Sequence, residues 1–74
     1  MTLDEVRQGQ ECEIVDIISE GIMGQRLLDM GFIPGTRIKV IRNAPLVDPV
    51  EFLLKGYYVS LRHSEAQKVE VNLL

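Results

Sequence analysis

The stretch Arg26–Phe52, which reads RLLDMGFIPGTRIKVIRNAPLVDPVEF, joins the end of a predicted helix to a strand, a loop and a second strand. Gly31 is placed to end the helix in a left-handed conformation, which glycine adopts without a steric penalty. Phe32 follows it and is expected to pack back against Leu27. The stretch therefore predicts a helix that turns directly into a β-sheet.

A Pro-Gly turn leads from this helix into a predicted strand over residues 36–43. Ile38 and Val40 share one face of the strand, and basic side chains occupy the other face. Ile41 follows Val40 directly and breaks the alternation of apolar and polar residues. This break predicts a bulge or a sharp bend in the strand.

Residues Ala44–Pro49, APLVDP, are predicted to form a loop, because two prolines within so few residues are incompatible with a central strand. The prolines stiffen the loop, so binding through it costs little ordering entropy. Leu46 and Val47 are apolar where exposure is expected, and exposed apolar patches mark interaction sites. Two interpretations stay open: a docking surface for a partner, or a rigid turn whose Leu46 tucks into the mouth of a barrel. The candidate partner-binding residues are Ala44, Pro45, Leu46, Val47, Asp48 and Pro49.

The N-terminal part of the chain predicts a short helix followed by a strand. Thr2 and Glu5 have the spacing of a capping box. Residues 11–18 are rich in β-branched side chains and predict a strand with Cys12 and Ile14 facing one way. The alternation blurs beyond Ile14, so we expect the far end of this strand to be buried on both faces.

A longer helix is predicted over residues 19–31, because Met23, Leu27 and Met30 are spaced to share one face. The C-terminal part then predicts a β-hairpin, a single helical turn and a last strand. The hairpin covers residues 50–62 with its tight turn at Lys55-Gly56, the helical turn covers 64–67, and the last strand runs over 68–74 with Val69, Val71 and Leu73 facing inward.

The order of these elements predicts a mainly β fold in a single domain over residues 1–74. Five short strands, a helix after the first strand and short helical turns indicate a small, partly closed barrel. Closing a sheet in this way removes edges that would otherwise pair with other chains. A domain of this size buries only roughly 60% of the surface of its unfolded chain, so a deep substrate cavity is not expected.

The composition excludes several classes of protein. The net charge of −3 argues against a nucleic-acid binder, since phosphate contacts require a basic face. The single cysteine, Cys12, cannot form an internal disulfide and is expected in the core. The charged N-terminus does not resemble a signal peptide, and no apolar run approaches the roughly 20 residues of a membrane span. We therefore expect a cytoplasmic protein.

No constellation of residues indicates catalysis, a cofactor or a built metal site. A metal site needs several converging ligands, and this chain has one cysteine and one histidine, far apart. His63 with Glu65 forms at most a weak, adventitious exposed pair. No serine or cysteine lies in a recognisable nucleophile elbow, and the glycines before the helix lack the Gly-Lys-Ser/Thr ending of a P-loop. The sequence predicts a protein that is not an enzyme.

Three motifs in this order resemble the FeoA family. A helix followed by Leu-Gly-x-x-Pro-Gly is matched by Leu28, Gly31, Pro34 and Gly35. An Ala-Pro-Leu-Gly-Asp-Pro loop is matched by Ala44, Pro45, Leu46, Asp48 and Pro49. A Leu-Arg pair before a Glu-Ala turn is matched by Leu61, Arg62, Glu65 and Ala66. The resemblance extends from about Thr2 to Val71.

The resemblance implies an SH3-like barrel and a non-enzymatic accessory or regulatory module for ferrous iron uptake. Its implied partner is a FeoB-like ferrous iron transporter with a cytosolic GTPase domain, on whose cytosolic part the module docks. The acidic net charge argues against a nucleic-acid partner. The resemblance implies a link to the membrane only through this transporter, and self-association into a homo-oligomer stays open. The alternative is a metal-sensing SH3-like domain related to those of iron-dependent transcriptional repressors.

The chain departs from the family pattern inside the loop. Val47 stands where the family usually has glycine. If that position requires a positive φ, a β-branched residue there is strained.

Overall fold

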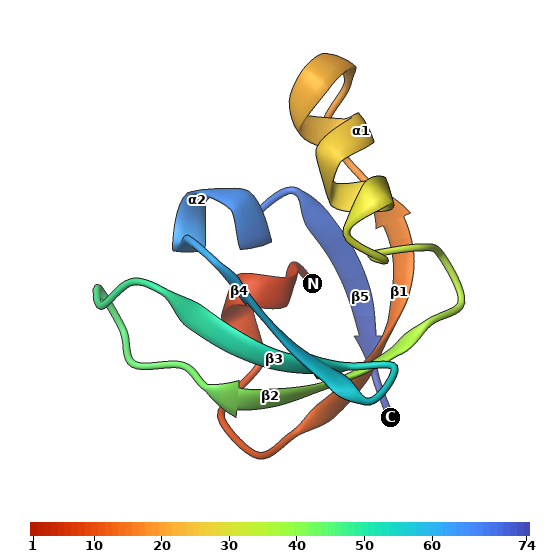
Figure 1. The fold of residues 1–74 in the computed structure, drawn as a ribbon. Coiled ribbons are helices and arrows are strands. Elements are labelled where there is room, and N and C mark those ends of the chain that lie inside the picture. The colour runs from red at the N-terminus through yellow and green to blue at the C-terminus, as the bar shows by residue number, and fades with distance from the viewer.

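The computed structural model describes residues 1–74 as one curled antiparallel sheet with three short helical segments (Figure 1). The strands are ordered β4-β3-β2-β1-β5, and α2 connects the two edge strands β4 and β5. This is the predicted mainly β, partly closed barrel. The elements are η1 (Leu3–Glu5), β1 (Glu11–Ile17), α1 (Gly21–Asp29), β2 (Arg37–Arg42), β3 (Val50–Leu54), β4 (Tyr57–Leu61), α2 (His63–Ala66) and β5 (Val69–Leu73).

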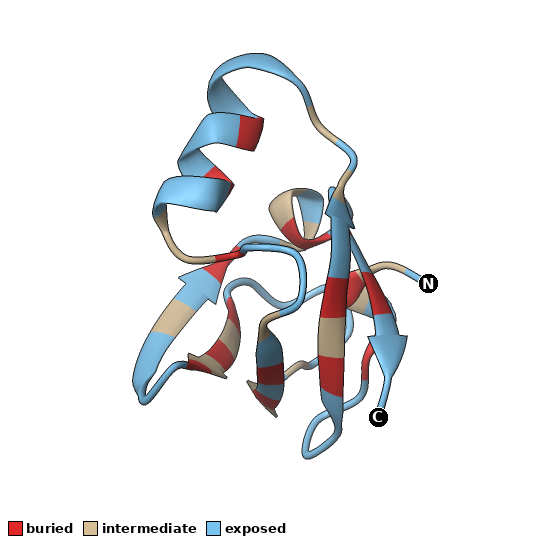
Figure 2. Ribbon diagram, turned by 90° about the vertical axis from the view of Figure 1, so that its right-hand side faces the viewer, coloured by how far each residue is buried: buried red, intermediate tan, exposed pale blue.

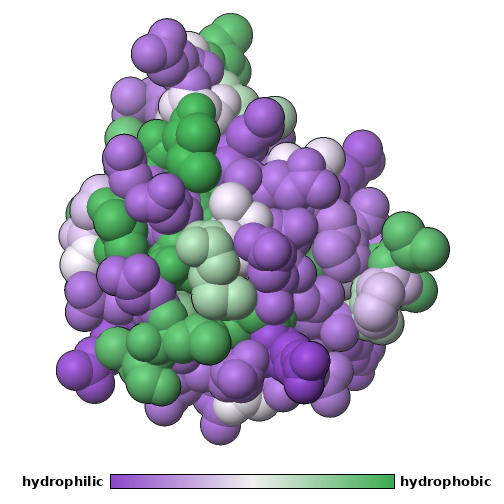
Figure 3. All heavy atoms as spheres, turned by 180° about the vertical axis from the view of Figure 1, so that it is seen from behind, coloured by the Kyte–Doolittle hydropathy of each residue, from purple (hydrophilic) through white to green (hydrophobic).

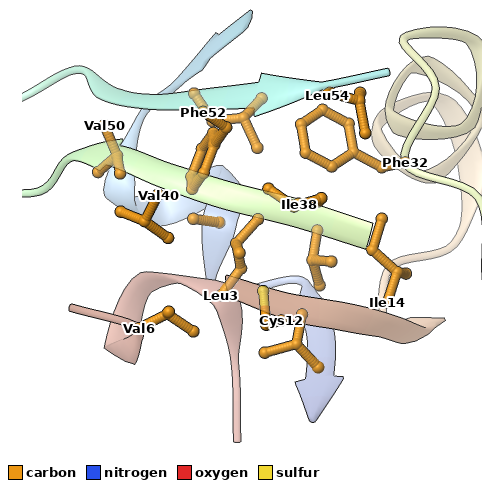
Figure 4. Packing of buried hydrophobic residues seen from close by; sticks show 14 of the residues in the cluster. Leu3, Val6, Cys12, Ile14, Phe32, Ile38, Val40, Val50, Phe52 and Leu54 are labelled. Atoms are coloured by element: carbon orange, nitrogen blue, oxygen red, sulfur yellow. The ribbon is translucent and has the colours of Figure 1, made fainter. Parts of the chain in front are cut away.

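The core lies inside the curled sheet: buried residues alternate with more exposed ones along the strands (Figure 2), and the buried side chains pack together in its interior (Figure 4). Phe32, which enters from the end of α1, meets Phe52 of β3 edge to face, with ring centroids 6.1 Å apart. Cys12 is fully buried in this core, as predicted. The buried apolar residues are Leu3, Val6, Cys12, Ile14, Leu27, Phe32, Ile38, Val40, Val50, Phe52, Leu54, Leu61, Ala66, Val69 and Val71.

Two bulges bend the sheet into a barrel. The pairing of β2 with β3 shifts between Val40 and Arg42, which confirms the irregularity predicted at Ile41. The pairing of β1 with β5 shifts between Ile14 and Asp16, and this second bulge was not predicted. The far end of β1 is not buried on both faces: Val15 is exposed, because no element covers the outside of the barrel there. That prediction was wrong.

The helix α1 begins at Gly21, later than predicted, and ends in a Schellman motif, as predicted. The backbone N–H of Phe32 donates to the carbonyl of Leu27 at 3.0 Å, and the N–H of Gly31 donates to that of Leu28 at 3.0 Å. Gly31 has a φ of 104°. Met23 is 38% exposed, whereas Leu27 is buried, so the two do not share one buried face as predicted.

The hairpin of β3 and β4 forms as predicted. Lys55 and Gly56 have positive φ values of 50° and 85° at its tight turn. The turn sets the register, so that Phe52 pairs with Val59 and Val50 pairs with Leu61. The strand β4 runs along the edge of the sheet and ends at Leu61, just before α2.

The last two elements differ from the prediction in detail. The helix α2 begins one residue earlier than predicted, and its first turn is capped by Glu65, which accepts the backbone N–H of Arg62 at 3.0 Å. Ser64 is therefore not the cap. Leu73 is 47% exposed at the end of β5, so its predicted inward position was wrong. None of the helices has the length and apolarity to cross a bilayer.

Candidate partner-binding loop

The loop between β2 and β3 is built on a turn whose central residues are Pro45 and Leu46. The backbone N–H of Val47 donates to the carbonyl of Ala44 at 3.2 Å across this turn. Leu46 has a φ of 63°, in the left-handed region where a position of this kind favours glycine. The positive φ that we considered for Val47 therefore falls on Leu46 instead.

The apolar side chains of the turn point into solvent. Leu46 is fully exposed, at 101% of its reference area, and Val47 is 57% exposed. Apolar atoms stand out from the right-hand edge of the rear view, at the place of the loop between β2 and β3 (Figure 3). Leu46 therefore does not tuck into the mouth of the barrel. All six predicted partner-binding residues are exposed.

His63 at the start of α2 fastens the far end of the loop. One carboxylate oxygen of Asp48, Oδ1, accepts the backbone N–H of His63 at 2.8 Å and lies 2.7 Å from its ring nitrogen Nδ1. These hydrogen bonds, first from the backbone and then from the side chain of His63, hold the pKa of Asp48 below its usual range. The nearby charges of His63 and Arg62 act in the same direction.

Asn43 fastens the near end of the loop to the N-terminal segment. Its side-chain nitrogen Nδ2 donates to the backbone carbonyls of Asp4 at 3.0 Å and Val6 at 2.8 Å. Its oxygen Oδ1 lies 3.0 Å from Nε2 of His63. Asn43, His63 and Asp48 therefore form one chain of contacts that joins both ends of the loop, which we call the loop clamp.

The polar atoms of His63 and Glu65 are engaged in contacts within the chain. Both ring nitrogens of His63 face oxygens of the loop clamp. Glu65 uses Oε1 to cap α2, and its Oε2 lies 3.6 Å from a guanidinium nitrogen of Arg26. No group of three or more His, Cys, Asp or Glu side chains is placed to hold a metal ion.

Sequence reasoning found the loop but missed Asn43 and His63 as its supports. The register of the hairpin predicts one of these contacts. Val50 pairs with Leu61, so Asp48, two residues before Val50, falls opposite His63, two residues after Leu61. No comparable pattern pointed to Asn43. Its partners Val6 and Asp4 are separated from it by 37 and 39 positions in the chain.

Comparison of the sequence with known proteins gives a family match and relatives that are named as Fe(2+) transport proteins. The FeoA domain matches residues 1–73. A Fe(2+) transport protein A/Fe(2+) transporter FeoB fusion protein of Porphyromonas gingivalis is 42% identical over 74 residues, which are the whole of this chain and 9% of the fusion protein. A putative Fe(2+) transport protein A of Campylobacter jejuni is 35% identical over 74 residues, which are 100% of both proteins.

Solved structures agree with this placement. The NMR structure of a FeoA-like protein from Clostridium acetobutylicum is 35% identical and has a TM-score of 0.90, covering 100% of this chain and 86% of that one. Stenotrophomonas maltophilia FeoA complexed with zinc, described as a procaryotic SH3 domain protein, is 24% identical with a TM-score of 0.87, covering 97% and 89%. A manganese-dependent transcriptional repressor shares the fold alone, at 19% identity and a TM-score of 0.89, with 100% and 41% covered. The chain has an SH3-like fold and belongs to the FeoA domain family.

Proposed function

We propose that this chain is a non-enzymatic accessory module for ferrous iron uptake that docks on the cytosolic part of a FeoB-like transporter. The names of its relatives support the process, since both are Fe(2+) transport proteins. The Porphyromonas gingivalis relative supports the partner, because it joins the two proteins in one chain. In this proposal the residues of docking are the exposed loop Ala44–Pro49, and the module works in the cytoplasm.

The observation that carries the docking site is the state of Leu46. Its left-handed backbone costs about 1 kcal/mol in a residue with a Cβ. Its side chain is fully exposed and contributes nothing to the core in return. Burial of a leucine side chain stabilises by about 1.5–3 kcal/mol, which exceeds that cost. Contact with a partner is what would supply this burial.

The shape of the loop supports the same conclusion. Prolines at both of its sides restrict the backbone, and the loop clamp ties the flanking residues Asn43 and Asp48 to the barrel. A loop that is ordered before binding loses little conformational entropy on binding. The loop therefore presents Leu46 and Val47 as a preformed apolar knob.

The metal-sensing alternative is supported by likeness in fold alone, to repressors such as the manganese-dependent one, which is 19% identical. A shared fold does not carry a shared function. We therefore do not propose it.

The experiment that tests the proposal is calorimetric titration of the chain into the isolated cytosolic GTPase domain of a FeoB-like transporter, with and without a GTP analogue. We expect binding in at least one nucleotide state. Leu46→Asp should weaken it at least about tenfold, because a carboxylate would enter an apolar contact. The circular dichroism spectrum should not change, since Leu46 packs against nothing in the barrel.

The matched control is Ile22→Asp. Ile22 is 89% exposed at the start of α1, away from the loop, so this variant makes the same change on another surface. It should bind like the unaltered chain. Equal affinity of the Leu46→Asp variant and the unaltered chain would overturn the assignment of the docking site, and the absence of binding in every nucleotide state would overturn the choice of partner domain.

A further inference from the structure

We propose that His63 is a positioning residue that holds the docking loop in its doubly protonated form, so that the shape of the loop depends on pH. The effect on partner affinity rests on the proposed function. The effect on the loop itself does not, because the loop clamp lies entirely within this chain.

The ring nitrogen Nε2 of His63 lies 3.0 Å from Oδ1 of Asn43. The orientation of the Asn43 amide is fixed, since its Nδ2 donates to the two backbone carbonyls of Asp4 and Val6. The oxygen of an amide only accepts hydrogen bonds. The nitrogen Nε2 must therefore carry a proton to complete this contact.

The other ring nitrogen, Nδ1, lies 2.7 Å from Oδ1 of Asp48, which also accepts the backbone N–H of His63. The lowered pKa of Asp48 keeps this carboxyl group ionised, and an ionised carboxylate only accepts. The nitrogen Nδ1 must therefore also carry a proton.

A neutral imidazole carries only one N–H, so it cannot satisfy both contacts. One ring nitrogen would direct its lone pair at an oxygen atom, either that of Asn43 or that of Asp48. The imidazolium ion satisfies both and forms a charge-assisted hydrogen bond with Asp48. The geometry of the loop clamp is thus complementary to the protonated ring.

The groups around His63 are of mixed charge and most are already engaged. The carboxylates of Asp4 and Glu5 accept hydrogen bonds from Thr2. Asp4 and Glu5 of η1 and Arg7 after it line the same pocket as His63. Arg62 precedes His63 at the start of α2, and Glu65 lies within α2.

Two titrations therefore bound the range in which the loop clamp is closed. On the alkaline side His63 loses a proton, the contact to one oxygen becomes repulsive, and the hold on Asp48 weakens. On the acid side, the pKa of Asp48 is lowered in the folded chain. The stabilisation from its carboxylate is therefore complete above the ordinary pKa of aspartate, and it is lost only as pH falls through the lowered pKa. Histidine is the side chain whose charge ordinarily changes between about pH 5 and about pH 8. The switch therefore operates on the alkaline side.

NMR of the ¹⁵N-labelled chain between about pH 5 and about pH 8.5 tests the loop part of the proposal. We expect both ring nitrogens of His63 to be protonated at the acid end. The backbone amide signals of Leu46 and Val47 should shift with the same midpoint as the ring. His63→Gln should abolish this shift, and the control Glu51→Gln, which removes a carboxylate outside the loop clamp, should retain it.

Loop amides that do not respond to pH, or a ring nitrogen that stays unprotonated throughout, would overturn the proposal. A midpoint that is the same in the Glu51→Gln variant and the unaltered chain supports it. Asp48→Asn offers a second variant, because its amide oxygen still accepts while its charge is gone. We expect it to fold and to reduce the response of the Leu46 and Val47 amides to pH.

Titration into the transporter domain at about pH 6 and about pH 8 tests the effect on affinity. We expect binding about fivefold tighter at the lower pH, and no such ratio for the His63→Gln variant. A loop that titrates in a chain that does not bind would leave the loop clamp standing and overturn the proposed function. Binding with equal affinity at both pH values, in a chain whose loop titrates, would overturn the coupling.

Discussion

Leu46 occupies the left-handed region with a φ of 63°, although its side chain meets only solvent. Glycine takes this conformation without the clash of a Cβ, so the position costs stability in exchange for an exposed apolar group. Strain of this kind is concentrated at functional sites. Stability and the proposed docking therefore make opposite demands on position 46.

Leu46→Gly should raise the free energy of unfolding by about 0.5 kcal/mol, because the relief of strain exceeds the added entropy of the unfolded chain. Val47→Gly should lower it by about 0.5–1 kcal/mol, since Val47 has no left-handed backbone to relieve. Urea denaturation of both variants measures the difference. A loss of stability in both variants would show that the backbone of Leu46 is not strained.

Cys12 gives a second prediction at this scale. Burial raises the pKa of its thiol from 9.0 to about 11. The unfolded chain thus releases this proton at lower pH than the folded chain, so stability falls as pH rises between about 9 and about 11, by at most about 1.4 kcal/mol per pH unit. The stability of a Cys12→Ala variant, measured by urea denaturation over the same range, should lack this component. Parallel curves for the two proteins would contradict the prediction.

At the scale of the elements, Tyr57 connects the hairpin to the helix. Its hydroxyl group donates to the carbonyl of Met30 at 2.8 Å, at the C-terminal end of α1. A Cβ added to Gly31 would lie 2.7 Å from the same hydroxyl oxygen, so the helix end and the tyrosine fit closely. This contact and the Schellman motif together fix the point at which α1 turns into the barrel.

Tyr57→Phe should lower the free energy of unfolding by about 0.5–1.5 kcal/mol, the contribution of one hydrogen bond. It should also speed hydrogen exchange at the amides of Gly31 and Phe32, because the end of α1 opens more often. Tyr58→Phe is the matched control: Tyr58 is 66% exposed and its hydroxyl makes no hydrogen bond within the chain. Equal effects of the two substitutions would show that the contact to Met30 contributes nothing.

In the whole molecule, the two most exposed large apolar side chains lie on different parts of the barrel: Leu46 in the loop between β2 and β3, and Ile22 in α1. The loop lies beside the open ends of β2 and β3, whereas α1 stands above the other part of the sheet (Figure 1). Docking through the loop, as proposed, would leave α1 free. The Porphyromonas gingivalis relative is a protein in which a similar module is fused to FeoB.

Joining this chain by a flexible linker to the transporter's cytosolic domain should make docking intramolecular, at an effective concentration on the order of millimolar. The Leu46→Asp defect should then be smaller than in the titration of separate proteins, because the tether offsets the lost affinity. Energy transfer between labels on the module and the domain measures the docked fraction. A defect of the same size in both formats would contradict docking through this loop.

Features that depend on local rules follow from the order of the residues. Alternating side chains predicted the strands, the Lys55-Gly56 pair set the hairpin, and Gly31 ended α1, because φ preferences and side-chain periodicity act within a few residues. The pairing of the hairpin even implied that Asp48 and His63 are neighbours. The sequence also predicted which loop is exposed, since prolines exclude a central strand.

The folded chain sets the features that depend on distant neighbours. It placed the left-handed turn on Leu46 instead of Val47, and it directed Leu46 outward. It also joined Asn43 and His63 into the loop clamp across 20 residues of chain. Burial, strain and protonation at these positions are set by which strands lie side by side, and a periodic pattern in one strand contains no information about the side chains that the curled sheet brings against it.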